Sequence, residues 1–304
     1  MVHRQIKSST LIWLILTPIL LGIIIFLSIF ILSQQKGQDA EPQIEQEITA
    51  EQSQNPTFIN LQPIVDKWTA SAPEKSGIVI YDLDNQQIAA THNADQLFSM
   101  ESLYKLFIVY EGYLEVENGE LDQNMVFADG TTVSECLDIT IRESDSKCAT
   151  NLYNVINKSE LFNFLNREGF LQTSLSDLQS TPNEILKIMQ KYYYHDGLSD
   201  ETWAKIQDSM LNQPPTDNGL CDGLCNWRQG LPSGFSIATV YNKVGWKYND
   251  VDNAWSTYND AAIVEFPATE VTPARKYIIV IMTSETSPNS IVQFGADIER
   301  AVLL

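Results

Sequence analysis

Five segments of this chain have the β-branched and aromatic composition of strands, and they form two groups separated by a long stretch of helical pattern. The first two are joined by turn residues, Asp84 and Asn85, whereas the other three fall in the last third of the chain. Apolar residues at helical spacing precede the first group and follow the last. The strand segments are 77–81, 87–91, 236–246, 261–266 and 277–283, and the outer helices are 58–70 and 290–303.

Strands from both ends of a chain share a core most economically when they form one sheet. The pattern therefore predicts an α/β (α+β) fold with one antiparallel five-stranded sheet. The two terminal helices would flank this sheet, and the middle of the chain, to about residue 210, would form an all-helical lobe. We expect a cleft between lobe and sheet, because pockets commonly form where two such units meet.

A serine and a lysine stand close together at the start of an apolar run over 106–110. Ser102 lies three residues before Lys105, so on a helix the two side chains lie on one face, one turn apart. An apolar pocket disfavours the ammonium form, so we expect a lowered pKa for Lys105 and a neutral amine that can take the Ser102 proton. The pattern is not specific by itself, because Ser144 and Lys147 repeat it, and a helix start with a surface lysine explains either copy.

The first 56 residues have the composition of an anchor and a linker. Residues 11–32 are apolar and uncharged over a length that spans a bilayer as a helix, and Arg4 and Lys7 precede them. The positive-inside rule then predicts a cytoplasmic N-terminus at 1–10 and a transmembrane anchor at 11–32. A cleaved signal peptide is the alternative, but the apolar run is long and no small-residue cleavage site closes it. Residues 33–56, rich in Gln, Glu and Ser, are typical of a disordered linker.

The remaining residues, 57–304, form the predicted globular domain. The N-terminal helix would anchor this domain to the outer side of the cell membrane. The whole chain has 304 residues and a formal net charge of −20. So acidic a surface repels nucleic acid, and no basic stretch offsets it, so we expect no nucleic-acid partner. The predicted location is the cell membrane, single-pass, with an extracytoplasmic domain.

Three separated stretches of this domain carry motifs in the order that one family shows. They are Phe98-x-Met100-x-Ser102-x-x-Lys105, then Ser144-Asp145-Ser146 about 40 residues on, then Lys243-Val244-Gly245 on a late strand. The chain resembles the penicillin-recognising serine hydrolases, most closely the class A β-lactamases, whose motifs are S-x-x-K, S-D-N and K-T-G. The resemblance covers the chain from about residue 57 and singles out Ser102, rather than Ser144, as the nucleophile.

The resemblance implies a serine hydrolase that acts on β-lactams or D-alanyl cell-wall peptides, without a metal or other cofactor. Ser102 would attack an amide or lactam carbonyl and become acylated, and Lys105 would be the base for this step. Ser144 would pass a proton to the leaving nitrogen.

Four further residues fall in the substrate site that the resemblance implies. Lys243 would supply positive charge to a substrate carboxylate. Gly245 would let the substrate backbone approach the strand. The backbone N–H groups of Ser102 and Trp246 would form the oxyanion hole. Ser146 stands at the third position of the second motif.

The sequence departs from the family pattern at three places. Ser146 replaces an asparagine, and Val244 replaces the threonine whose hydroxyl binds a substrate carboxylate. The glutamate that positions the deacylating water in class A β-lactamases is also missing, because segment 171–180 is short and contains no Glu. Its one carboxylate, Asp177, is expected to be a loop or helix-cap residue.

These departures leave three functions open. Without a base to activate water, an acyl-enzyme should form and persist, which favours slow turnover of β-lactams by a penicillin-binding or D-Ala-D-Ala peptidase activity. A domain with the β-lactamase fold that binds cell-wall peptide without turnover is the first alternative. An ectodomain with a structural role and an accidental motif set is the second.

Four cysteines occur as two close pairs, Cys136 with Cys148 and Cys221 with Cys225. Outside the membrane both pairs could form disulfides, and a Cys136–Cys148 bridge would hold the loop that carries Ser144. A four-thiolate zinc site is the competing interpretation, although one pair alone has a spacing close to that of metal ligands.

Overall fold

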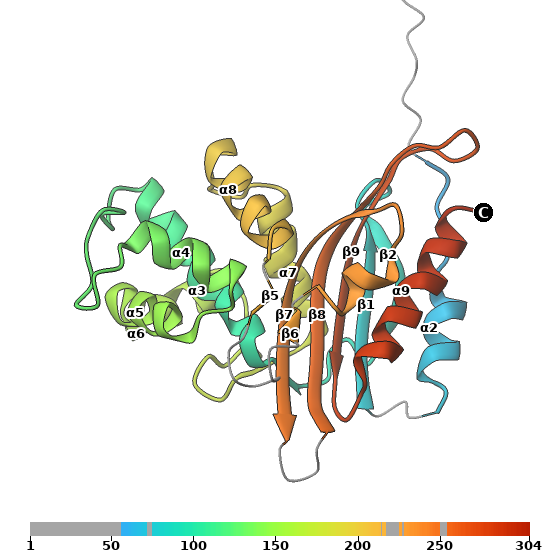
Figure 1. The fold of residues 1–304 in the computed structure, drawn as a ribbon, viewed down its shortest axis with the longest axis horizontal. Coiled ribbons are helices and arrows are strands. Elements are labelled where there is room, and N and C mark those ends of the chain that lie inside the picture. The colour runs from blue at the N-terminus through green and yellow to red at the C-terminus, as the bar shows by residue number, and fades with distance from the viewer. Residues whose placement is uncertain (1–55, 72–74, 214, 217–224, 227, 250–253) are drawn as a thin grey trace, which may run out of the picture. The chain divides into compact units, whose positions relative to one another are not determined.

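The computed structural model of the protein describes residues 56–71, 75–213, 215–216, 225–226, 228–249 and 254–304 (Figure 1). The predicted N-terminal segment and transmembrane anchor, and all but the last residue of the predicted linker, lie outside these ranges. Within them, no helix combines the length and the apolar character needed to cross a bilayer.

Five strands form one antiparallel sheet in the order β2-β1-β9-β8-β7, which confirms the predicted sheet. Strand β9 lies between β1 and β8 and so joins the N-terminal hairpin to the other C-terminal strands. The strands are β1 (Ser76–Asp82), β2 (Gln87–His92), β7 (Thr239–Asn249), β8 (Ala254–Phe266) and β9 (Arg275–Thr283).

Helices α2 (Gln62–Thr69) and α9 (Pro288–Val302) cover one face of this sheet, as predicted (Figure 1). They contact each other through Trp68 and Phe294, whose ring centroids are 5.1 Å apart. Helix α2 begins at Gln62 rather than at 58, because Leu61 donates its backbone N–H to β2 and a proline occupies the first helical turn.

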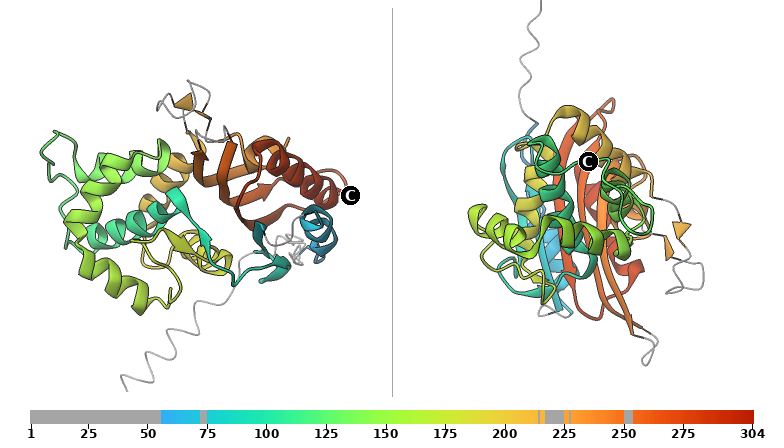
Figure 2. Two further views of the ribbon diagram at one scale, coloured as in Figure 1. Left: turned by 90° about the horizontal axis from the view of Figure 1, so that it is seen from below. Right: turned by 90° about the vertical axis from the view of Figure 1, so that its left-hand side faces the viewer.

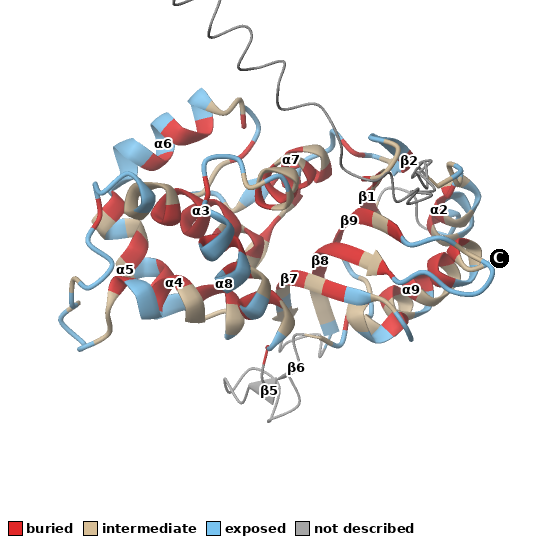
Figure 3. Cartoon of the chain, turned by 90° about the horizontal axis from the view of Figure 1, so that it is seen from above, coloured by how far each residue is buried: buried red, intermediate tan, exposed pale blue. Residues whose placement is uncertain are grey.

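Within the described ranges, six helices form the predicted helical lobe on the other side of the sheet (Figure 2). Helix α3 is its centre, since every residue from 105 to 113 is buried (Figure 3), as expected for a helix that others surround. The helices are α3 (Tyr104–Glu117), α4 (Val133–Arg142), α5 (Ser146–Ile156), α6 (Lys158–Arg167), α7 (Pro182–Tyr193) and α8 (Asp200–Leu211).

Two strand boundaries differ from the sequence prediction. Strand β7 begins at Thr239 rather than 236, because the carboxylate of Glu299 on α9 accepts the backbone N–H groups of Ser236 and Ile237. Strand β8 begins at Ala254 rather than 261. Its first half mixes the strand-favouring Trp255, Thr257 and Tyr258 with polar residues, and the ladder with β7 spans all of it.

Candidate active site

A short irregular segment delivers the first motif to the edge of the sheet. Strand β3 (Phe98–Ser99) pairs with β4 (Gln179–Ser180), and the 3-10 helix η2 (Glu101–Leu103) then leads into α3. Strand β7 packs on η2 at Gly245, where an added Cβ would lie 2.2 Å from the carbonyl oxygen of Met100. Glycine is therefore needed at 245 so that the two segments can meet.

Ser102 and Lys105 come together as their spacing predicts. The Nζ atom of Lys105 lies 3.3 Å from the Oγ atom of Ser102. Lys105 is buried in the first turn of α3, whereas Ser102 is partly exposed on η2. The hydroxyl is thus open to a ligand on one side and faces an amine on the other.

Ser144 reaches the same amine from the loop between α4 and α5. Its backbone has a φ of 55°, a left-handed conformation that is uncommon for a residue with a side chain. Lys105 donates to the carbonyl oxygen of Ser144, and its Nζ atom lies 3.3 Å from Ser144 Oγ and 3.2 Å from Ser146 Oγ. Next to it, Asp145 caps α5 and accepts the backbone N–H of Cys148 at 2.6 Å.

Lys243 completes the group from strand β7. Its Nζ atom lies 2.8 Å from Ser144 Oγ and 2.9 Å from the carbonyl oxygen of Val244. The hydroxyl of Ser144 therefore stands between two amines. This arrangement can move a proton between Lys105 and Lys243 through one oxygen atom.

Burial sets the charge of both amines, since the exposed fraction is 0 % for Lys105 and 1 % for Lys243. Burial lowers the pKa of Lys105 to about 8, and the carboxylate of Asp145 opposes this. Burial and then the charge of Lys105 hold the pKa of Lys243 well below its ordinary value, and Asp260 opposes them. A neutral Lys105 is therefore accessible near neutral pH, and it can accept a proton from a hydroxyl group.

The backbone N–H and carbonyl groups of Trp246 point out of the sheet edge, away from β8. On the next strand, the N–H and the carbonyl group of Tyr258 both bond to the hydroxyl of Thr283 on β9. Because an antiparallel residue directs both backbone groups to the same side, its partner Trp246 directs its own away from β8. The indole of Trp246 instead stacks on Tyr258, with ring centroids 4.2 Å apart. Trp246 thus offers its amide, and not its ring, to the edge.

The structure places the two replaced motif residues differently. Ser146 is exposed at the start of α5, and its Oγ atom lies 3.2 Å from Lys105 Nζ. Val244 is buried in strand β7.

The segment 171–180 contains no carboxylate aimed at Ser102. Asp177 is exposed and accepts the Ser174 hydroxyl at 2.6 Å, which confirms its interpretation as a loop residue. The buried carboxylate behind the segment is Glu184 of α7, which sequence reasoning missed. Its two oxygens accept the backbone N–H of Gln172 at 2.9 Å and the Thr173 hydroxyl at 2.5 Å. Among the described residues, no carboxylate makes a hydrogen bond to Ser102.

The disulfide Cys136–Cys148 is present and joins α4 to α5. It closes a loop of twelve positions that carries Ser144, so it restrains the unusual backbone at that residue. The predicted pair Cys221–Cys225 lies outside the residues whose side chains are described. Over the described part of the chain, no group of His, Cys, Asp and Glu side chains is arranged to hold a metal ion.

Asn259 is a further site-supporting residue that the sequence did not reveal. It pairs with Gly245 across the ladder, and its Nδ2 atom donates to the Ser99 carbonyl at 2.7 Å while its Oδ1 atom accepts the Thr283 N–H at 2.8 Å. One side chain thus ties β8 and β9 to the segment that leads into Ser102. An isolated asparagine in a strand carries no sequence signal for this role.

The five-stranded sheet with its helical lobe, and the two lysines that meet at Ser144, are features of the penicillin-recognising serine hydrolases. The family model described as the beta-lactamase enzyme family matches residues 60–303. The chain therefore belongs to this family. A search of curated proteins finds no match.

Solved structures with the same fold share little sequence with this chain. A β-lactamase from Desulfarculus baarsii has a TM-score of 0.62 at 15 % identity, over 78 % of this chain and 95 % of that one. A PBP-A variant, in an acyl-enzyme complex with penicillin G, has a TM-score of 0.64 at 18 % identity, over 80 % and 96 %. A β-lactamase from Xanthomonas campestris has a TM-score of 0.64 at 15 % identity, over 81 % and 99 %. At these identities the likeness shows a common fold.

Proposed function

We propose that this protein is a serine hydrolase whose Ser102 forms an acyl-enzyme with β-lactams or with D-alanyl peptides of the cell wall. The observation that carries the proposal is the position of Lys105 Nζ, 3.3 Å from the hydroxyl oxygens of both Ser102 and Ser144. The family of the chain supports the substrate class.

The proposed reaction uses the amines in turn. Ser102 Oγ forms a bond to the carbonyl carbon of the amide or lactam, and its proton passes to neutral Lys105. The amide N–H groups of Ser102 and Trp246 would stabilise the oxyanion. When the carbon–nitrogen bond breaks, Ser144 Oγ gives its proton to the leaving nitrogen and regains one from a lysine.

We further propose that the acyl-enzyme is long-lived. Glu184 accepts hydrogen bonds from Gln172 and Thr173 of the 171–180 segment, and Asp177 accepts one from Ser174. Neither carboxylate is set to activate a water molecule beside Ser102. A persistent ester would favour a penicillin-binding or peptidase role over efficient hydrolysis of β-lactams.

The same proposal locates the domain outside the cell membrane. It is supported by the uncharged apolar segment 11–32, by the basic residues before it and by the acidic residues after it. A disulfide beside Ser144 is consistent with an oxidising compartment.

The test is incubation of the purified protein with a fluorescent penicillin, followed by electrophoresis and intact-mass measurement. We expect a stable adduct on the wild type, none on Ser102→Ala, and an unchanged adduct on Ser134→Ala, a control at an exposed serine of α4. Rapid multiple turnover would refute the long-lived acyl-enzyme. Reversible binding without an adduct would instead favour the non-catalytic binding domain.

A further inference from the structure

An exposed lysine of strand β7 lies beside the proposed oxyanion amide and has no part in the proposed reaction. Lys247 directly follows Trp246 in the strand, and its side chain is exposed. Over the described part of the chain, no carboxylate forms an ion pair with it. Glu101, the carboxylate of the adjacent 3-10 helix η2, instead accepts the Ser99 hydroxyl at 2.8 Å. The ammonium group of Lys247 is therefore available to a ligand.

Lys247 lies on the face of the sheet that carries the site. Side chains along a strand alternate between the two faces, and the pairing of β7 with β8 is regular up to Lys247. On this face Lys243 reaches Ser144, and Gly245 packs on η2. Lys247 is the next residue in the same row, about 7 Å beyond Gly245 and about 13 Å beyond Lys243 along the strand.

The order of these groups along β7 sets the direction of a bound substrate. In the proposed reaction the leaving nitrogen takes a proton from Ser144, whose Oγ atom lies 2.8 Å from Lys243 Nζ. The carbonyl oxygen would lie at the amide of Trp246. The leaving group then lies toward Lys243, and the acyl group extends the other way, past Trp246. Lys247 is the next residue in that direction, so its side chain lies beside the acyl group.

We propose that Lys247 is a specificity-determining residue that favours acyl donors with a carboxylate close to the scissile amide, such as peptides with an acidic residue in the acyl part. A local cation is effective here because the chain carries a net charge of −20, which repels a substrate that has an additional negative charge. The inference rests on the proposed acylation of Ser102 and specifies the class of its acyl donor.

A second role of an exposed lysine at this place would need no ligand. Strand β7 is the last in the order of the five-stranded sheet, and a lysine on an edge strand can keep sheets of two molecules from associating. That role leaves the relative rates of two substrates unchanged. A ratio of two acylation rates therefore separates substrate recognition from protection of the edge.

The experiment compares benzylpenicillin with carbenicillin, which has one further carboxylate on the acyl side chain. The second-order rate constant of acylation is measured for each by quenched-flow mass spectrometry, and the readout is the ratio of carbenicillin to benzylpenicillin. The protonation of Lys105 and the charge of Lys243 affect both penicillins alike and cancel in this ratio. We expect the ratio to fall about threefold in Lys247→Gln and about tenfold in Lys247→Glu.

Three controls separate the local charge from other effects. Lys247→Arg keeps the cation and should keep the wild-type ratio, whereas a fall equal to that of Lys247→Gln would overturn the inference. Lys158→Gln removes an exposed lysine at the start of α6 and should leave the ratio unchanged, which accounts for the change in net charge. Raising the salt concentration from about 20 mM to about 0.5 M should bring the ratios of the wild type and Lys247→Gln together, because salt screens exposed charges.

The remaining outcomes distinguish the two proposals. Acylation of the wild type by both penicillins, with an equal ratio in Lys247→Gln, overturns the role of Lys247 and leaves the proposed function intact. A difference between the two proteins that is as large at high salt as at low salt also overturns this role. Absence of any acylation in the wild type overturns the proposed function, and the role of Lys247 with it.

Discussion

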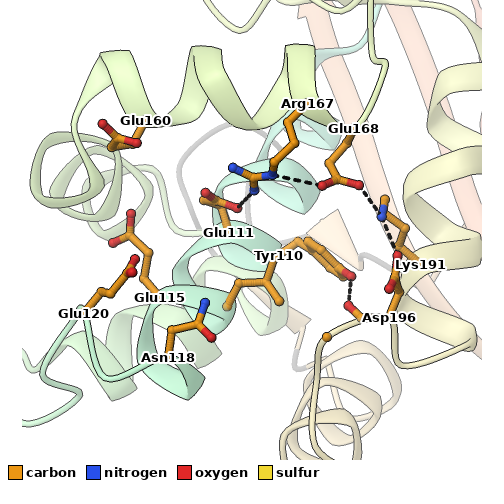
Figure 4. A pocket seen from close by; sticks show the side chains of 12 residues that line it. Tyr110, Glu111, Glu115, Asn118, Glu120, Glu160, Arg167, Glu168, Lys191 and Asp196 are labelled. Atoms are coloured by element: carbon orange, nitrogen blue, oxygen red, sulfur yellow. Dashed lines mark hydrogen bonds and ion pairs between the residues drawn. The ribbon is translucent and has the colours of Figure 1, made fainter.

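Helix α3 contributes to two groups of polar side chains, each with a lysine. The pKa of the lysine is lowered in one group and raised in the other. At the first turn of α3, Lys105 is buried among hydroxyl and carbonyl oxygens, and Lys243 joins it from β7. The C-terminal half of α3 lines a cavity of about 530 Å³ whose walls carry six carboxylates and two cations, Arg167 and Lys191 (Figure 4).

Each cation of the cavity lies between two carboxylates. The Nζ atom of Lys191 is 2.6 Å from Glu168 and 2.5 Å from Asp196. Burial lowers the pKa of Lys191, but these two hydrogen bonds outweigh it, and the pKa lies above its ordinary value. For Lys105 burial prevails, because its hydrogen-bond partners carry no full charge. The deeper burial of Lys105 and its uncharged partners together make it the lysine that can serve as a base.

Lys105→Arg should give the largest effect on activity. Arginine keeps its proton at any ordinary pH, so the rate of acylation by a fluorescent penicillin should fall about a thousandfold. Lys191→Arg is the matched control and should keep the wild-type rate, because arginine still pairs with both carboxylates. A rate for Lys105→Arg close to that of the wild type would show that Lys105 is not the base.

Replacement of each lysine by methionine should change stability in opposite directions. Lys105→Met removes a buried ammonium whose pKa falls from 10.5 to about 8, a shift equivalent to about 3 kcal/mol. We expect the free energy of unfolding at pH 7 to rise by about 1–3 kcal/mol after the lost hydrogen bonds are included. Lys191→Met leaves Glu168 and Asp196 without their cation and should lower it by up to about 1 kcal/mol, because Asp196 is largely exposed.

Urea denaturation at several pH values measures both effects. Because the folded-state pKa of Lys105 lies below the unfolded-state value, the unfolded chain binds more protons between pH 8 and 10.5. The stability of the wild type should therefore rise across this window, and the gain from Lys105→Met should shrink. If both lysine-to-methionine variants changed the free energy of unfolding in the same direction, the proposed difference between Lys105 and Lys191 would be wrong.

The acylation rate of the wild type should depend on pH through the same group. Lys105 must be neutral to accept a proton, so the rate should fall about tenfold per pH unit below the pKa of about 8. Stopped-flow measurement from pH 5.5 to pH 9 with the methyl ester of benzylpenicillin isolates this step from carboxylate binding. A rate that stays constant down to pH 6 would contradict the assignment.

Glu115→Gln should give the smallest effect, at the acidic cavity. Burial and then Glu111, Glu120 and Glu160 raise the pKa of Glu115 to about 7. A raised carboxyl pKa means that stability is lost as the pH rises from the unfolded value toward 7, so the variant should gain stability above pH 7 and not at pH 4. Since Glu115 is half-exposed, we expect less than about 1 kcal/mol by urea denaturation. Glu270→Gln, in an exposed loop, should show no such gain.

The sequence predicted those features of the fold and site that depend on residues close together in the chain. The period of the apolar residues located the strands and the two terminal helices. The spacing of Ser102 and Lys105 predicted a contact that the structure shows at 3.3 Å. Two cysteines around the second motif predicted the disulfide that joins α4 to α5.

Other features depend on neighbours that are distant in sequence. Asn259 becomes significant because the ladder sets it opposite Gly245. The first half of β8 contains Asn259 and Asp260, which are uncommon in strands, and it pairs with β7 along its whole length. The left-handed backbone of Ser144 has no signal in its residue type.

By itself, the sequence determined which residues could do chemistry here and in what order they occur, since residue type and period are properties of the chain. The apolar run already indicated a lowered pKa for Lys105, but the tertiary structure decided how the charges of the site residues depend on one another. A pKa depends on burial and on the groups within a few ångströms, and for Lys105 and Lys243 those groups come from strands and helices far apart in the chain.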